Sequence, residues 1–261
     1  MSLNSHFVSR FLTTPWEHGD RMLWYYDFEN NRLRSGSSRS LFARDGANTA
    51  EVESRLNRLV ETPIAAARTQ LWADRREVSQ DLEWPLFRAL ALLLLLQPFR
   101  SAESSDASQT LEELILRPDE DIDGLARAIS ARWQLMRITV SNRAPLAYPS
   151  AGYFPLLGAP IGGKCSFGLA IPLSPIHAFV GVPSDVRPEQ TESWRTNDAG
   201  FVSNYSVGHR SPFVVVHPNV VRALSEAEIV KAIRDARAGV VLGIELCGQL
   251  ASLLRQMDAV A

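Results

Sequence analysis

Cysteine and lysine are both scarce in this sequence. Its 261 residues include two cysteines, Cys165 and Cys247, and nearly all of the basic residues are arginine, because Lys164 and Lys231 are the only lysines. Two cysteines can form one disulfide at most and cannot complete a zinc site alone. We attribute the arginine excess to the codon bias of a GC-rich bacterial genome rather than to a specialised phosphate site.

Long apolar runs are missing as well. The longest one, Ala89–Leu96, is much shorter than the roughly 20 residues that a membrane-spanning helix needs. The N-terminus lacks the basic start and the continuous apolar stretch of a secretory signal peptide. We find no internal repeat and no low-complexity segment. We therefore expect a cytoplasmic protein that does not enter the membrane.

The balance of charge argues against two classes of partner. The formal net charge of -2 provides no electrostatic attraction to nucleic acid or to an anionic membrane. The hydrophobic fraction of 46% and the charged fraction of 21% are those of an ordinary soluble globular protein. A chain of this length can bury an ample core, and we expect residues 1–261 to form a single domain.

Familiar catalytic and metal-binding motifs are absent. The sequence has no Gly-x-Ser-x-Gly elbow, no His-Glu-x-x-His and no Cys-x-x-Cys. The acidic cluster Asp119-Glu120-Asp121-Asp123 is typical of a solvated helix start, where the helix dipole favours negative charge. We therefore expect no metal and no cofactor.

One segment has the spacing of a phosphate-binding loop. It is Gly158-Ala159-Pro160-Ile161-Gly162-Gly163-Lys164-Cys165, with cysteine in place of the magnesium-binding Ser or Thr. Such a loop must open a helix, whose N-terminal amides bind the phosphate. Here the next residues, 166–172, are strand-like, so we interpret the segment as a glycine-rich connection between strands.

The first half of the sequence predicts helices and one small hairpin. The hairpin covers residues 21–35 with Asn30-Asn31 at its turn, and the Ser/Arg-rich stretch 34–40 is expected to be a loop. Asn48 and Glu51 resemble a capping box at the start of a helix. Pro63 is expected to break or kink that helix and to open a second one, which reaches Trp72.

A buried central helix is predicted next, because residues 84–96 are apolar on every face. We expect Asp81 to cap it and Gln97-Pro98 to end it. A polar loop over 101–108 follows. Further helices are expected from about Gln109 to before Pro118, and over 122–132.

The second half of the sequence predicts strands followed by a helix. The predicted strands cover residues 134–140, 167–171, 178–182 and 213–216. The helical segment 222–258 opens with a capping box of Ser225 and Glu228. It is either a strut across the sheet, which we favour, or the seam of a homodimer. The fold class is therefore α+β: a helical N-terminal half with a small hairpin, packed on a mainly antiparallel sheet from the C-terminal half and ending in a long helix.

Polar residues stand out inside several apolar or turn-forming segments. These residues are His6, Arg10, Arg100, Ser141, Asn142, Arg143, Ser174 and Asn204. Each also has an ordinary structural reading, such as a hydrogen-bonded histidine, a cation at a helix C-terminus or a turn beside a proline. Our hypothesis is that they line one polar pocket where the two halves of the chain meet.

Taken together, the ordered segments resemble an uncharacterised, mostly bacterial family called domain of unknown function 4238. The segments that carry the resemblance are His6-Phe7-Val8-Ser9-Arg10-Phe11-Leu12, Trp24-Tyr25-Tyr26-Asp27, Glu53 with Glu61, Gln97-Pro98-Phe99-Arg100, Ser141-Asn142-Arg143-Ala144-Pro145, Pro172-Leu173-Ser174-Pro175 and Asn204. The resemblance covers residues 6–217. Two positions depart from the family pattern: Ser9 replaces a proline, and Asn142 replaces an aspartate. The resemblance implies a single domain and brings no established activity.

Three functional hypotheses follow. The first, which we favour, is a binding or sensing protein whose pocket takes a small anionic ligand or a partner, with Arg10, Arg100, Ser141, Arg143 and Asn204 as binding candidates. The second is a hydrolase-like enzyme that uses His6 as general base, with Asn142 or Ser174 orienting the substrate. The third is a structural or oligomerisation role for the C-terminal helix.

Overall fold

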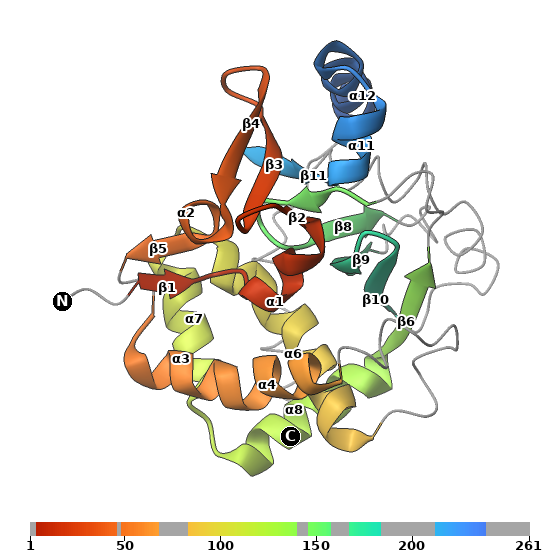
Figure 1. Ribbon diagram of the computed structural model, residues 1–261. Coiled ribbons are helices and arrows are strands. Elements are labelled where there is room, and N and C mark those ends of the chain that lie inside the picture. The colour runs from red at the N-terminus through yellow and green to blue at the C-terminus, as the bar shows by residue number, and fades with distance from the viewer. Residues whose placement is uncertain are drawn as a thin grey trace.

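The computed structural model (Figure 1) describes residues 4–45, 48–67, 83–139, 146–157, 167–183 and 212–238. Several predictions concern other residues. They are the helix reaching Trp72, the cap at Asp81, the loop 158–165, and the part of the C-terminal helix beyond residue 238. These predictions lie outside the described residues.

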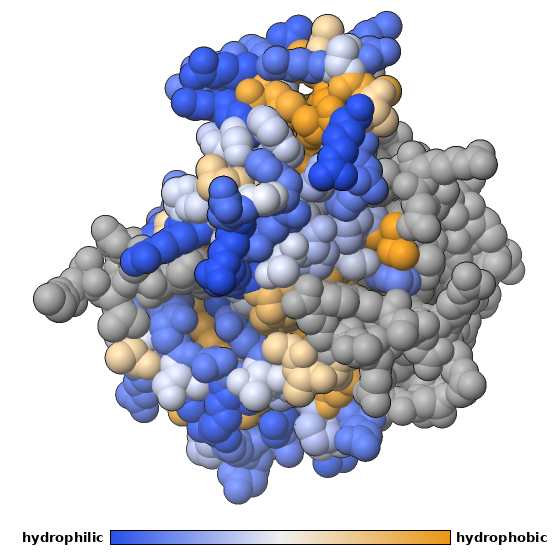
Figure 2. Space-filling model, viewed as in Figure 1, coloured by the Kyte–Doolittle hydropathy of each residue, from blue (hydrophilic) through white to orange (hydrophobic). Residues whose placement is uncertain are grey.

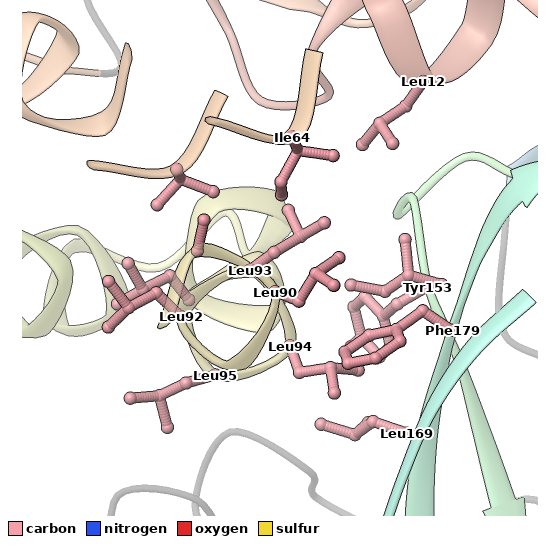
Figure 3. Close-up of a cluster of buried hydrophobic side chains, with 14 of the residues drawn as sticks. Leu12, Ile64, Leu90, Leu92, Leu93, Leu94, Leu95, Tyr153, Leu169 and Phe179 are labelled. Atoms are coloured by element: carbon pink, nitrogen blue, oxygen red, sulfur yellow. The ribbon is translucent and has the colours of Figure 1, made fainter. Parts of the chain in front are cut away.

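Helix α6 (Trp84–Ser101) is the centre of the fold, as predicted. Every residue from Ala89 to Arg100 is buried. Figure 3 shows the leucine side chains leaving the helix in all directions, with Leu93 toward Ile64 and Leu94 toward Phe179 on the sheet. An all-round apolar helix is stable only when other elements cover every face, which explains its central place.

The predicted end of α6 is wrong, because the helix continues through Pro98 to Ser101. A proline lacks one N–H, and near a helix end this removes a single hydrogen bond. The last turn is stabilised by a hydrogen bond from the N–H of Ala102 to the carbonyl oxygen of Pro98, at 3.2 Å. The extension matters because it places Arg100 inside the core.

A second correction concerns the helix before it. Elements α3 (Ala50–Leu56), η2 (Asn57–Glu61) and α4 (Thr62–Ala66) follow one another without a break. The cap is Thr49, whose hydroxyl accepts the N–H of Val52 at 3.3 Å, rather than the predicted Asn48. Pro63 lies in the first turn of α4, as predicted. The expected break before it is wrong, because η2 is a π turn, whose wider spacing relieves the clash between the proline ring and the preceding turn.

The next two helices are α7 (Ser105–Ile115) and α8 (Asp119–Arg132). Helix α7 begins inside the predicted loop 101–108, because the hydroxyl of Ser104 caps the N–H of Ala107 at 3.2 Å. The acidic residues at the start of α8 lie in its first turn, as predicted.

The described strands form three antiparallel sheets. One has the order β6-β10-β9-β8, a second has β2-β3-β11-β7 with β4 paired to β3, and the third joins β1 to β5. Their bounds are β1 (Asn4–His6), β2 (Glu17–His18), β3 (Met22–Asp27), β4 (Arg32–Ser37), β5 (Ala43–Asp45), β6 (Trp133–Thr139), β7 (Tyr148–Pro149), β8 (Phe154–Leu157), β9 (Phe167–Ser174), β10 (His177–Pro183) and β11 (Phe213–Val216). All described pairings are antiparallel, and the four strands predicted in the second half are confirmed.

The N-terminal hairpin is confirmed, but the expectation that the sheet comes from the C-terminal half is wrong for one of the sheets. Its turn includes Asn31 with a φ of +52°, a conformation that asparagine tolerates. Strand β3 pairs with β11 along Trp24–Asp27, so the hairpin belongs to a sheet built from both halves of the chain. The expected loop 34–40 is instead the end of β4 followed by helix α2 (Ser38–Leu41), which the hydroxyl of Ser37 caps.

The C-terminal part contains α11 (Pro218–Ala223) and α12 (Glu226–Ala238). The capping box is confirmed, since the Ser225 hydroxyl accepts the N–H of Glu228 at 3.4 Å while the carboxylate of Glu228 accepts the N–H of Ser225 at 2.8 Å. Ile229 and Ile233 pack with Tyr26 and β11 in a small second core. Figure 2 shows apolar side chains gathered where α12 meets the hairpin. The described part of the helix therefore packs on the sheet that contains β3 and β11, and the choice between a strut and a dimer seam stays a prediction.

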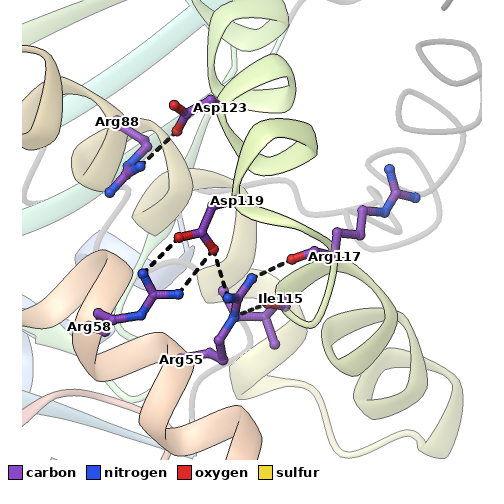
Figure 4. A network of polar contacts seen from close by, with 7 residues as sticks. All are labelled: Arg55, Arg58, Arg88, Ile115, Arg117, Asp119 and Asp123. Carbon is purple, nitrogen blue, oxygen red and sulfur yellow. Dashed lines mark hydrogen bonds and ion pairs between the residues drawn. The ribbon is translucent and has the colours of Figure 1, made fainter.

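Arginine side chains join the helices at their surface (Figure 4). The guanidinium of Arg55 donates to the carbonyl oxygens of Ile115 and Arg117 at the end of α7 and to Asp119 at the start of α8. Arg58 binds both carboxylate oxygens of Asp119, at 2.8 and 3.0 Å. These bonds lower the pKa of Asp119 to about 2, the hydrogen bond from Arg58 being the largest cause.

We expect Asp119→Asn to lower the melting temperature by about 2 °C at neutral pH, because an exposed network of this size is worth up to about 1 kcal/mol. The pKa of Asp119 is depressed, so its contribution is complete above the unfolded pKa of 3.8 and declines as the pH falls toward 2. Thermal melts across this range measure it. Asp121→Asn is the matched control, removing an exposed charge from the same helical turn. Equal effects of the two variants would contradict the role of the network.

Candidate functional site

The structure describes half of the eight predicted site residues. His6 lies on β1 opposite Ala43 of β5, and Arg10 opens helix α1 (Arg10–Thr13). Arg100 is in the last turn of α6, and Ser174 ends β9. The remaining candidates, Ser141, Asn142, Arg143 and Asn204, lie outside the described residues. The convergence of His6 with Asn142 therefore stays a prediction.

Arg10 lies at the surface. Half of its side chain is exposed, and its Nε atom lies 3.7 Å from Oε1 of Glu17. An ion pair at this distance and exposure contributes little to stability. Arg10 is therefore accessible to a partner but is not part of the buried cluster described next.

Arg100 is a buried cation that contacts Ser9 and Glu61, which come from distant parts of the sequence. Its side chain is 1% exposed, and Nη2 donates to Oε1 of Glu61 at 3.0 Å. Nη1 donates to the hydroxyl of Ser9 at 3.3 Å, and that hydroxyl donates to the same oxygen of Glu61 at 2.5 Å. We call Ser9, Glu61 and Arg100 the buried ion-pair cluster.

Local structure explains why these side chains meet. Ser9 occupies the cap position before α1, but its hydroxyl makes no capping bond there and is directed to Glu61 instead. Glu61 is the last residue of the π turn η2, and its side chain is 24% exposed. Arg100 and Ser9 are almost completely buried, so Glu61 is the member of the cluster that reaches solvent.

Gln97 holds the same N-terminal segment one turn earlier on α6. Its Nε2 donates to the carbonyl oxygens of Phe7 and Ala151, both at 2.9 Å. Since both partners are acceptors, the amide nitrogen must face them, and Oε1 is then buried with no hydrogen-bond partner among the residues that the structure describes. Gln97 and Arg100 are three residues apart, so one face of α6 binds two neighbouring positions of the N-terminal segment.

Tyr148 on β7 adds another buried polar group. Its ring packs edge-on against Trp16, with ring centroids 5.0 Å apart, and its hydroxyl has no hydrogen-bond partner among the described residues. Burial raises the pKa of the Tyr148 hydroxyl above its ordinary value, and the positive charge of Arg100 opposes part of that rise. The hydroxyl is therefore protonated at neutral pH and can act only as a neutral donor or acceptor.

Ser174 makes its described contacts within the hairpin between β9 and β10. Its hydroxyl oxygen accepts the N–H groups of Ile176 and His177 at 3.3 and 3.1 Å. The ring Nδ1 of His177 lies 3.0 Å from the same oxygen, so the one hydroxyl proton points to that nitrogen. Both side chains are buried. In the described structure Ser174 organises a turn.

Reasoning from individual residues missed Ser9, Gln97, Tyr148 and His177 as polar groups of the core. Two of them had a visible signal. Gln97 and Arg100 are polar residues three apart in an otherwise apolar helix, and Ser174 and His177 flank a two-residue turn. Glu61 was marked only by the family resemblance. Ser9 and Tyr148 carried no signal, because their neighbours are distant in sequence.

Metal-binding clusters and membrane-spanning helices are absent from the described part of the chain. No group of three or more His, Cys, Asp or Glu side chains there is placed to hold a metal ion. None of the described helices is both long and apolar enough to cross a membrane. The buried ion-pair cluster is therefore the strongest candidate site that the described residues offer.

Gly152→Ala tests the packing that holds this site. Gly152 has a φ of +77°, and an added Cβ would lie 2.7 Å from Nε2 of Gln97 and 2.8 Å from Cγ2 of Val8. We expect the free energy of unfolding in urea to fall by about 1–3 kcal/mol. Gly124→Ala is the control: nothing lies within 4 Å of its added Cβ, and in mid-helix it should stabilise by about 0.5–1 kcal/mol. A neutral Gly152→Ala would contradict the close packing around Gln97.

Comparison with known proteins adds no relative. No protein-family model, no curated protein and no solved structure shows significant similarity to this chain.

Proposed function

We propose that this protein is a binding or sensing protein in which an anionic group of a small ligand or partner takes the place of Glu61 on Arg100. The observation that carries the proposal is the exposure within the cluster. Arg100 is 1% exposed, whereas its counter-ion Glu61 is 24% exposed and can move into solvent.

The donors of the cluster suit an incoming anion. Oε1 of Glu61 already accepts from both the Arg100 guanidinium and the Ser9 hydroxyl. A ligand carboxylate or phosphate would use the same two donors, and guanidinium is well matched to either group. Exchange of one anion for another leaves the buried cation neutralised throughout, which avoids the large cost of an unpaired buried charge.

The backbone beneath Glu61 supports the same proposal. Residues 57–61 form a π turn, in which the N–H of Thr62 reaches the carbonyl oxygen of Asn57. Such turns occur often at functional sites, because they reorient one side chain within a helix. Here the reoriented residue is the removable counter-ion.

We further propose that the chain belongs to the family called domain of unknown function 4238, as a single cytoplasmic domain. In support, the segments that carry the resemblance contain Glu61, Gln97 and Arg100. These three side chains are joined by hydrogen bonds to one another or to the N-terminal segment. Ser9 replaces the family's proline, so its hydroxyl bond to Glu61 is particular to sequences with serine there.

The hydrolase-like enzyme is the second candidate function. One contact favours it: the Ser9 hydroxyl donates to a carboxylate, which is the beginning of a nucleophile and base pair, and His6 lies three residues away in the same segment. Ser9 is only 2% exposed, which restricts the access of a substrate. We therefore rank binding above hydrolysis.

Glu61→Ala with added acetate tests the exchange. Removing Glu61 takes a carboxylate counter-ion away from the buried Arg100, so we expect a loss of about 3 kcal/mol in the free energy of unfolding. Acetate should restore much of that loss, because it can occupy the place of the lost carboxylate. For the wild type, a panel of small carboxylates and phosphate should raise the melting temperature at higher concentrations, since each must displace Glu61.

Two controls make the result specific. Glu53→Ala removes a carboxylate from the same helical segment. That carboxylate accepts a hydrogen bond from Asn48 and has no ion pair with an arginine of the described residues, so acetate should not rescue the variant. Glu61→Ala combined with Arg100→Met should also be insensitive to acetate. If acetate rescues Glu61→Ala but no anion stabilises the wild type, the cluster is only an internal cross-link and the proposed function is wrong.

A further inference from the structure

Strand β4 is the outer edge of the five-stranded sheet. It pairs only with β3 among the described strands, and its residues Arg32, Arg34 and Ser35 are exposed. Figure 1 shows the hairpin of β3 and β4 projecting from the body of the molecule. An exposed edge carries backbone N–H and C=O groups that can pair with another strand.

The register identifies which backbone groups face outward. The N–H of Phe28 donates to the carbonyl oxygen of Pro212 at 3.1 Å, so the even-numbered residues of β3 bond toward β11. Its odd-numbered residues therefore bond toward β4, where their partners are even-numbered. Leu33, Ser35 and Ser37 consequently direct their backbone groups away from the sheet.

A side chain of helix α12 already binds one of these backbone groups. Oε1 of Glu226 accepts the N–H of Leu33 at 3.0 Å, in the place that a carbonyl oxygen of a paired strand would take. The carbonyl oxygen of Ser37 accepts the hydroxyl of Ser40 at 2.9 Å. Between them, the N–H and C=O of Ser35 have no hydrogen-bond partner among the described residues. The outward backbone groups at the centre of β4 are thus unpaired among the described residues, whereas the N–H of Leu33 near one end is bound by the side chain of Glu226.

The charges beside this opening are positive. Arg32, Arg34 and Arg39 are all exposed. Only Arg34 has a described ion pair, with Asp27 at 3.1 Å. Figure 2 shows a largely hydrophilic surface over this part of the hairpin. A strand that lies along β4 would gain from acidic side chains facing these arginines.

We propose that the edge of β4 binds an extended acidic segment of a partner protein as an added strand, and that Glu226 competes with that segment for the N–H of Leu33. Backbone bonds to Leu33 and Ser35 provide the pairing, and the arginines select for acidic side chains. A second copy of this chain is a poorer occupant, since antiparallel pairing of two β4 edges brings two sets of arginines together.

The test uses a labelled peptide of alternating glutamate and valine, Glu-Val-Glu-Val-Glu-Val, and fluorescence anisotropy with the full chain. Glu226→Ala should bind it roughly 3–10-fold more tightly, because one competing hydrogen bond is removed. Ser35→Pro should weaken binding at least about tenfold, since it removes an outward N–H and no bond to β3. Added salt should weaken binding of the wild type.

Ser35→Ala separates the backbone from the side chain, because it keeps the N–H and loses only the hydroxyl contact to His18. It should bind the peptide like the wild type. Thermal melts of Ser35→Pro establish that it is folded. Arg32→Glu should weaken binding of the glutamate peptide, and a Lys-Val-Lys-Val-Lys-Val peptide should not bind the wild type.

Four results would overturn the proposal. They are equal binding of the glutamate and lysine peptides, full binding by Ser35→Pro, no binding by either wild type or Glu226→Ala, and self-association of Glu226→Ala without peptide. The last result would assign the edge to a second copy of the chain. By contrast, self-association of Arg32→Glu would support the proposal, because it would show that the arginines keep two β4 edges apart. None of these variants touches the buried ion-pair cluster.

Discussion

The burial of Arg100 is the constraint on which the rest of the structure depends. Helix α6 is apolar on all sides and packs at the centre of the molecule, so an unpaired guanidinium in its last turn would cost several kcal/mol. Glu61 and Ser9 neutralise and hydrogen-bond it. Because these residues are far apart in sequence, their bonds to the Arg100 guanidinium fix the N-terminal segment and the helical segment 50–66 against α6.

The N-terminal segment is therefore part of the core rather than an appendage. Val8, Leu12 and Trp16 are essentially unexposed, and Trp16 donates its indole N–H to the carbonyl oxygen of Leu146 at 2.7 Å. The end of α6 is closed by Arg44, which binds the carbonyl oxygens of Ser101 and Ala102 and stacks on Phe7. The buried ion-pair cluster thus joins the N-terminal segment to the helices.

Much of the fold could be predicted from local patterns. The central helix, the hairpin and the strands of the second half follow from apolar periodicity, which depends on neighbours in sequence. Element ends were less predictable. Pro98 lies inside α6, and the π turn carries the chain past Pro63, because packing around α6 outweighs the local preference of proline. Likewise, the hairpin joins β11 through pairing with residues almost two hundred positions away.

The candidate site, like the fold, could be predicted only in part. Sequence alone determined that Arg100 stands out in an apolar helix and that Ser174 lies at a bend, because both are anomalies within a local pattern. Only the tertiary structure decided that Arg100 is buried and paired with Glu61, that Arg10 lies at the surface, and that Ser174 caps a turn. The physical reason is that the free-energy cost of burying a charge depends on the groups that neutralise it. Here those groups come from other segments of the chain.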